Sequence, residues 1–150
     1  MYISVLTDYE LITRFQKQEE VFSLVCDDLV AFDSFYARTD GVWFGAYEGF
    51  TLIGTVFMQY YTSTTVEIHP ILLKGHKHKF LAFSKILFDM IFSGNIKKIN
   101  AVCPVIYPSN RNACKRVGFK DEGISRGSYL KGGILHDAYH LGLTKEDYYG

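Results

Sequence analysis

The sequence predicts one mixed α/β domain, on the strength of its length and two kinds of hydrophobic pattern. A chain of 150 residues is long enough for one domain that buries roughly 70% of its unfolded surface. Runs with the two-residue alternation of strands are interspersed with segments whose apolar residues recur at helical spacing. The clearest unit is a strand, a loop and a helix between Thr64 and Phe92. We therefore expect residues 1–150 to form a single domain built around that unit.

The first half of the chain predicts a strand, two helices and an antiparallel meander. The strand segments are rich in β-branched and aromatic residues, and short turns at Glu48-Gly49 and Thr62-Ser63 can join them as hairpins. Asp8 is a possible N-cap for the first helix. The expected elements are a strand over 2–6, a helix after Asp8, a helix through Phe22, Val25, Leu29 and Phe32, and strands over 42–47, 50–60 and 64–68.

The second half predicts an alternation of helices and strands. The segment 70–79 is expected to interrupt the strand pattern, because it contains Pro70 and five basic residues. After it we expect a helix over 80–92, a strand over 99–105, a helix over 109–117 capped by Ser109, and strands over 119–129 and 135–143. The order β-α-α-β-β-β-α-β-α-β-β indicates a mixed sheet with helices on both faces.

Charge and cysteine content exclude several classes of function. Sixteen basic residues balance sixteen acidic ones, so the basic excess typical of nucleic-acid or anionic-membrane binders is missing. No nucleic-acid or membrane partner is expected, whereas a near-zero net charge favours a homo-oligomer or a protein partner. Three widely spaced cysteines do not form a disulfide framework, which indicates reduced thiols and a cytoplasmic location. We find no signal peptide and no apolar run long enough to cross a membrane.

Metal and nucleotide chemistry are also not expected. His69, His76 and His78 lie close together, but no carboxylate or cysteine completes a zinc-ligand set with them. His136, Asp137 and His140 are expected on a strand at the sheet edge, with their polar side chains outward. No serine nucleophile elbow, Walker loop or dinucleotide fingerprint is present.

Several motifs point to one family. Ile68-His69-Pro70 precedes the helix over 80–92, and Gly118-Phe119 follows the next short helix. The C-terminal part then carries Glu122-Gly123, Arg126, Gly133 and Asp137. With the element order, these features resemble the GCN5-related N-acetyltransferase (GNAT) family over essentially the whole chain. The C-terminal part looks like the branch that modifies ribosomal protein N-termini and polyamines. The resemblance implies a sheet splayed between its fourth and fifth strands, and transfer of acetyl from acetyl-CoA to an amine: a protein N-terminus, a lysine or a small molecule.

The resemblance also implies an acetyl-CoA site. The family loop Gln/Arg-x-x-Gly-x-Gly/Ala, whose amides bind pyrophosphate, falls on residues 73–78. Histidine replaces both family glycines at 76 and 78, and leucine replaces the family Gln/Arg at 73. The loop nevertheless carries a positive cluster. The implied cofactor-binding residues are Ile68, Pro70, Ile71, Lys74, Gly75, His76, Lys77, His78, Lys79 and Asn110.

Three residues are candidates for the acid–base chemistry of acetyl transfer. Glu67 lies where some family members keep a general base. Cys114 holds the position of the family tyrosine that protonates the leaving thiolate, and a thiol could donate that proton. Tyr107 is close in sequence and could replace it. The alternatives are a small core cysteine and a solvated strand glutamate.

A non-enzymatic function is the second hypothesis. Some accessory proteins of tailed phages resemble the GNAT fold and carry a lysine-rich loop in place of the glycines, as residues 74–80 do here. This resemblance implies a catalytically degenerate protein that acts in phage head or virion assembly, or in another protein interaction. Such a bacteriophage protein would be located in the host cytoplasm.

Overall fold

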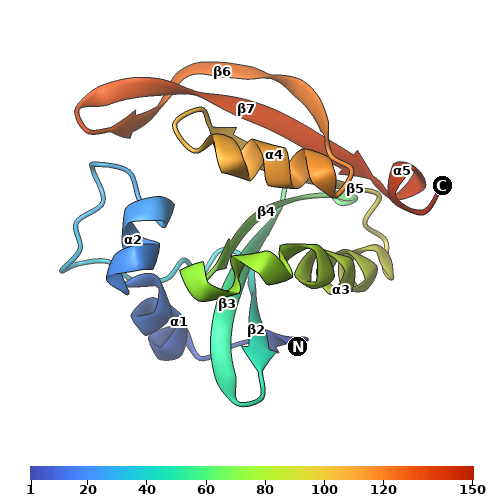
Figure 1. The fold of residues 1–150 in the computed structure, drawn as a ribbon, viewed down its shortest axis with the longest axis horizontal. Helices are drawn as coiled ribbons and strands as arrows, with labels where there is room; N and C mark the ends of the chain where they lie inside the picture. The colour runs from blue at the N-terminus through green and yellow to red at the C-terminus, as the bar shows by residue number, and fades with distance from the viewer.

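The protein, described here over residues 1–150 by a computed structural model, is built on one seven-stranded sheet (Figure 1). The strand order is β1-β2-β3-β4-β5-β7-β6. The strands are β1 (Tyr2–Leu6), β2 (Val42–Glu48), β3 (Thr51–Tyr60), β4 (Thr65–Leu72), β5 (Lys98–Pro104), β6 (Lys120–Lys131) and β7 (Ile134–Thr144). The helices are α1 (Tyr9–Gln16), α2 (Glu19–Val25), the 3₁₀ helix η1 (Lys74–Lys79), α3 (Phe80–Phe92), α4 (Pro108–Arg116) and α5 (Lys145–Tyr149). The predicted element order and mixed sheet are confirmed, with η1 and α5 in addition.

The sheet is divided by a short parallel contact between β4 and β5. Every other neighbouring pair is antiparallel. The two strands pair only from Thr65 to Glu67 on β4 and from Lys98 to Asn100 on β5. Beyond these residues β4 and β5 are no longer paired, which confirms the predicted splay.

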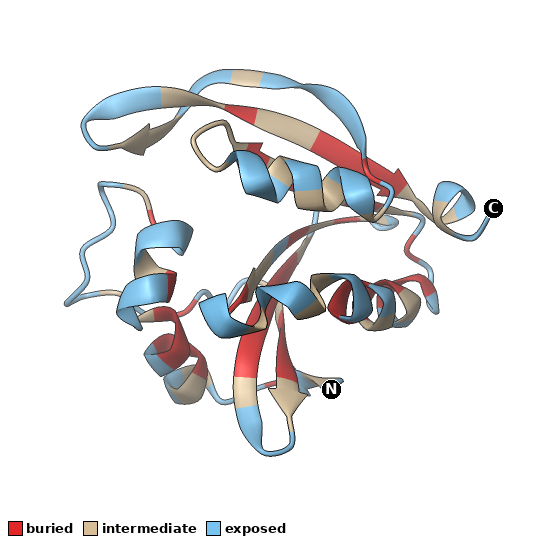
Figure 2. Ribbon diagram, in the orientation of Figure 1, coloured by how far each residue is buried: buried red, intermediate tan, exposed pale blue.

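Helices cover both faces of the sheet. On one face Ile12 of α1 packs with Trp43 and Phe57 in a small cluster. On the other, Phe83 and Leu87 of α3 belong to the main core together with Val66 of β4. The helix α4 lies on the same face as α3 (Figure 1). Figure 2 shows that the buried residues of α3 form a stripe toward the sheet, while its outer residues are exposed.

The local sequence explains why α1 and α3 form. The side chain of Asp8 accepts a hydrogen bond from the amide of Leu11 at 3.1 Å, so the predicted N-cap is confirmed. In α3 the apolar residues recur at helical spacing, and each buried large side chain contributes roughly 1.5–3 kcal/mol. The fully buried members of this stripe are Phe83, Leu87, Phe88, Ile91 and Phe92. No helix of the protein is long and apolar enough to span a membrane.

The second helix is shorter than predicted. It ends at Val25, and Leu29 and Phe32 lie in irregular chain. The carbonyl oxygens at the C-terminal end of α2 bind the β6–β7 hairpin. Lys131 Nζ donates to the carbonyl oxygens of Ser23 and Cys26 at 2.8 Å each. The helical pattern through Phe32 was therefore overridden by a contact with residues more than a hundred positions away.

The tip of that hairpin is fastened to the chain just after α2. The amides of Gly132 and Gly133, both at positive φ, donate to the carboxylate of Asp28 at 3.1 and 2.8 Å. These bonds lower the pKa of the Asp28 carboxyl. The hairpin thereby connects the half of the sheet that contains β5 to α2 on the other half (Figure 1).

Three further predictions were wrong. β4 continues through Pro70 to Leu72, because proline at 70 faces the side where β5 has already diverged and no partner needs its missing amide. Helix α4 begins at Pro108 with Tyr107 as its N-cap, so Ser109 is not the cap. The strand with His136, Asp137 and His140 is internal, between β5 and β6.

Candidate active site

The candidate site is the gap that opens between β4 and β5 beyond Glu67 and Asn100. The amide of Leu73 donates to the carbonyl of Ile53 at 2.9 Å, so by alternation the amide of Leu72 faces away from β3 and into the gap. On β5 the amide of Val105 donates to Asp137 at 2.9 Å, which directs the amide of Val102 into the same gap. The gap therefore presents unpaired backbone groups to an extended ligand.

Glu67 lies at the closed end of this gap, on the face covered by α1 and α2. Its carboxylate contacts His69 Nε2 at 3.0 Å. This hydrogen bond is the main cause that holds the pKa of Glu67 below its ordinary value, although partial burial opposes it. The positive charges of His140 and Arg38 act in the same direction. Glu67 is thus an anion at neutral pH.

Asn100 is a site residue that the sequence did not reveal. It is the register partner of Glu67 across the last paired position of β4 and β5, so the two side chains share a face. The Oδ1 atom of Asn100 is buried and has no hydrogen-bond partner. A buried acceptor without a partner beside a carboxylate is suited to a ligand that donates hydrogen bonds.

Cys114 lies on the opposite face of the sheet, on α4. Its Sγ is 3.9 Å from Sγ of Cys103 on β5. This contact and burial raise the pKa of the Cys114 thiol above its ordinary value, so the thiol keeps its proton at neutral pH. Glu67 and Cys114 therefore lie on opposite faces of the sheet, and Cys114 packs against β5.

Tyr107 and Asn110 sit at the start of α4. The hydroxyl of Tyr107 donates to the carbonyl of Ser23 at 3.3 Å, and its ring packs edge-on against Tyr129. This tyrosine helps to hold α2 against the hairpin, and its proton is engaged there. Asn110 is exposed in the first turn of α4, with its amide bonded to the carbonyl of Tyr107.

The basic segment after β4 is a 3₁₀ helix, and it places the predicted loop residues directly before α3. The amide of Lys74, its first residue, donates to Glu20 Oε2 at 3.2 Å. Lys79 is paired with Glu48 at 2.9 Å. The Nδ1 atom of His76 is buried without a partner. The segment thus presents a positive cluster, but acidic side chains already neutralise part of it.

Gly75 has open space around it. A Cβ atom built there would meet nothing within 4 Å, and the backbone has no positive φ. The fold therefore does not require glycine at this position. Close approach of a ligand to the backbone would require it, because any side chain would stand in the way.

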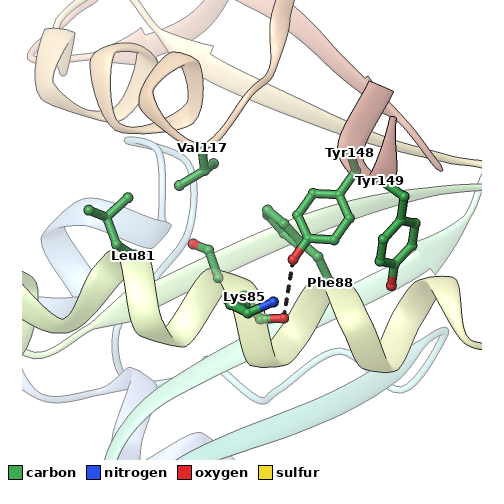
Figure 3. A pocket seen from close by; sticks show the side chains of 7 residues that line it. Leu81, Lys85, Phe88, Val117, Tyr148 and Tyr149 are labelled. Carbon is green, nitrogen blue, oxygen red and sulfur yellow. Dashed lines mark hydrogen bonds between the residues drawn. The ribbon is translucent and has the colours of Figure 1, made fainter. Parts of the chain in front are cut away.

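A separate pocket of about 390 Å³ lies between α3, the end of α4 and α5 (Figure 3). The Oγ atom of Ser84 is buried without a partner on its wall. Tyr148 closes one side, and its hydroxyl donates to the carbonyl of Lys85 at 3.5 Å. The sequence did not predict this pocket, because the five residues of α5 were not expected to be helical. No group of three or more His, Cys, Asp or Glu side chains is placed to hold a metal ion.

Neither a family model nor a curated protein sequence matches the chain. Solved structures do match it. Spermidine N-acetyltransferase from Vibrio cholerae, solved with CoA and spermine, superposes with a TM-score of 0.80 at 18% identity, over 99% of this chain and 97% of that one. A chimera of Vibrio cholerae SpeG and hSSAT gives a TM-score of 0.80 at 18% identity, over 99% of each chain.

The protein has the GNAT fold. The match covers nearly the whole of both chains, so the likeness extends over the entire fold and not over one part of it. The identity of 18% extends the likeness to the fold and not to the chemistry. The family resemblance seen in the sequence implies that acetyl-CoA would lie in the gap between the fourth and fifth strands, which are β4 and β5 here.

Proposed function

We propose that this GNAT-fold protein is an N-acetyltransferase that transfers an acetyl group from acetyl-CoA to an amine. The observation that carries the proposal is the gap between β4 and β5, where the unpaired amides of Leu72 and Val102 lie beyond the ionised carboxylate of Glu67. Its full-length structural likeness to N-acetyltransferases supports it.

The acyl donor is proposed to lie along the gap as an extended strand-like ligand. Amide groups in the donor's arm would pair with the free amides of Leu72 and Val102 and with the carbonyl of Pro70. Amides that converge on the thioester oxygen would stabilise the negative charge that develops when the amine attacks. Ile71 and the turn that follows would direct the donor's phosphates toward Lys74, Gly75 and Lys77, ahead of α3.

The acceptor is proposed to approach from the face of α1 and α2. Glu67 attracts its ammonium group and takes one proton, directly or through water, so that the free amine can attack the thioester carbon. A C–N bond forms, the C–S bond breaks, and the thiolate leaves. Cys114 then supplies a proton to the thiolate from the other face, and it regains one when the acylated nitrogen loses its second proton. A solved neighbour with CoA and spermine is consistent with an amine acceptor.

Calorimetry with acetyl-CoA and with CoA tests the proposal. We expect at least micromolar binding, and release of CoA when a panel of amines is added. Replacing both His76 and His78 with glycine should tighten binding, because these side chains lie where the backbone would meet phosphate. Absence of heat and of any thermal shift at millimolar CoA, in both the wild type and the double variant, would refute the proposal.

A second candidate is a protein-interaction role without catalysis. The observation in its favour is that Glu20 and Glu48 occupy the amide of Lys74 and the ammonium of Lys79, where a donor's phosphates would bind. Light scattering of the purified protein and co-purification from its native source test this role. A stable complex without CoA binding supports it, and a monomer that binds CoA excludes it.

A further inference from the structure

Cys103 and Cys114 form a close thiol pair that is isolated from the third cysteine. Their Sγ atoms are 3.9 Å apart, on β5 and α4. They are eleven positions apart in the sequence. The loop 105–107 between the two elements lets α4 fold back onto β5. Cys26 is buried at the end of α2. The pair therefore needs only a small approach of its sulfur atoms to become bonded.

The surroundings of the pair favour thiol chemistry over simple packing. A hydrogen bond from Cys114 lowers the pKa of the Cys103 thiol, and the nearby Arg111 guanidinium lowers it further. Arg111 lies over the ring of Tyr139 at 4.5 Å, and Tyr139 is the cross-strand partner of Cys103. The same helix turn leaves Cys114 partly exposed, while Cys103 is only 4% exposed. A peroxide can therefore reach the sulfur pair from the side of Cys114.

We propose that Cys103 and Cys114 are a reversible modification site that forms an intramolecular disulfide on exposure to a peroxide. A thiolate of the pair attacks one peroxide oxygen, which yields a sulfenic acid and releases hydroxide. The second cysteine then attacks the sulfenic sulfur, the S–S bond forms and hydroxide leaves, so that two thiols and one hydrogen peroxide give one disulfide and two waters. A dithiol reductant reverses the change.

The disulfide would fasten α4 to the half of β5 that no longer pairs with β4. It would also remove the thiol proton of Cys114. Because the bond links α4 to β5 covalently, it would restrict the movement of α4. Both effects follow from the fold alone, so the site forms whether or not the protein transfers acetyl groups.

Thiol counting and peptide mapping test the inference on the intact protein. After treatment with hydrogen peroxide and denaturation, free thiols should fall from three to one, and the intact mass should drop by two hydrogens. Trypsin should release the peptide 99–111 linked to the peptide 112–115, each of which carries one cysteine of the pair. The melting temperature of the oxidised protein should rise, and a dithiol reductant should restore the original value.

Matched variants separate this site from general oxidation. The C26S variant should lose both remaining thiols together, whereas C103S and C114S should each leave their unpaired cysteine unbonded within the chain. The inference is overturned if three thiols persist, if the linked peptides do not appear, or if the linkage forms no faster in the folded protein than in the denatured one.

Discussion

The carboxylate of Glu20 accepts a hydrogen bond from the backbone amide of Lys74 at 3.2 Å. Glu20 belongs to the first turn of α2, and Lys74 begins the basic segment before α3. A side chain on one face of the sheet thus supplies an anion to the segment in which the sequence predicts a pyrophosphate site. An incoming phosphate would have to displace this carboxylate.

The first prediction concerns that displacement. Glu20→Gln should increase affinity for CoA about five-fold, on the order of 1 kcal/mol, because a neutral amide competes less well for the Lys74 amide at this exposed position. Calorimetry measures the change. Glu19→Gln is the matched control, because Glu19 lies in the same first turn of α2 and its substitution removes the same charge. Equal effects of the two variants would show that Glu20 has no special contact with the ligand.

The second prediction uses the space around Gly75. Gly75→Ala should leave stability unchanged or raise it by up to about 1 kcal/mol, because alanine is the better helix former and its Cβ meets nothing within 4 Å. If backbone at 75 contacts phosphate, CoA affinity should nevertheless fall about ten-fold or more. Gly94→Ala, another glycine with open surroundings, is the control and should change neither quantity. Full CoA affinity in Gly75→Ala would remove this residue from the site.

The third prediction concerns Glu67. Glu67→Gln should lower kcat for acetyl transfer by about 10²- to 10⁴-fold, the usual contribution of a general base. The pKa of Glu67 is lowered from its ordinary value of 4.5, so the wild-type carboxylate remains ionised at pH values somewhat below 4.5. Activity should therefore persist at those pH values until the protein unfolds. Steady-state rates across pH check both statements. Glu122→Gln, on exposed β6, should keep full activity, and loss of activity in both variants would argue for a general charge effect.

The fourth prediction concerns the alkaline limit of stability. Burial, with the Asp89 carboxylate beside it, raises the pKa of Tyr148 from 10.0 to about 12. Since the raised value favours the neutral phenol in the folded state, this contribution to stability is complete below pH 10 and is lost as pH rises through about 12. Phenolate absorbance of the wild type minus that of Tyr148→Phe should show this late titration. A difference spectrum that appears near pH 10 would show that α5 does not hold Tyr148 against α3.

The main elements were predictable because their patterns are local. The stripe through Phe83 and Leu87 recurs at helical spacing. The strand predicted over 42–47 is rich in aromatic and β-branched residues, and the observed strand covers 42–48. The second helix was over-extended for the converse reason. Its apolar spacing continues to Phe32, but Lys131 and Asp28 fasten the chain to the β6–β7 hairpin, which is a contact that no local pattern encodes.

The candidate site divides in the same way. Glu67 and Cys114 could be named because they fall on positions that the family resemblance assigns to a general base and a general acid. That they lie on opposite faces of the sheet is decided only by the folded structure, in which α4 packs Cys114 against Cys103 of β5. Asn100 was missed because a lone asparagine in an apolar strand has no signature, and only its position opposite Glu67 gives its unpaired oxygen a meaning.

Local sequence patterns were enough to predict the order of helices and strands, the apolar face of each element and the basic character of residues 74–79. These depend on periodicity and on residue type, which are properties of neighbouring positions. The tertiary structure decided where β4 leaves β5, that Glu20 reaches the amide of Lys74, and that Cys103 and Cys114 face each other. Each of these joins segments that pack together only when the whole sheet has formed, because their contacts depend on distance in space and not on spacing along the chain.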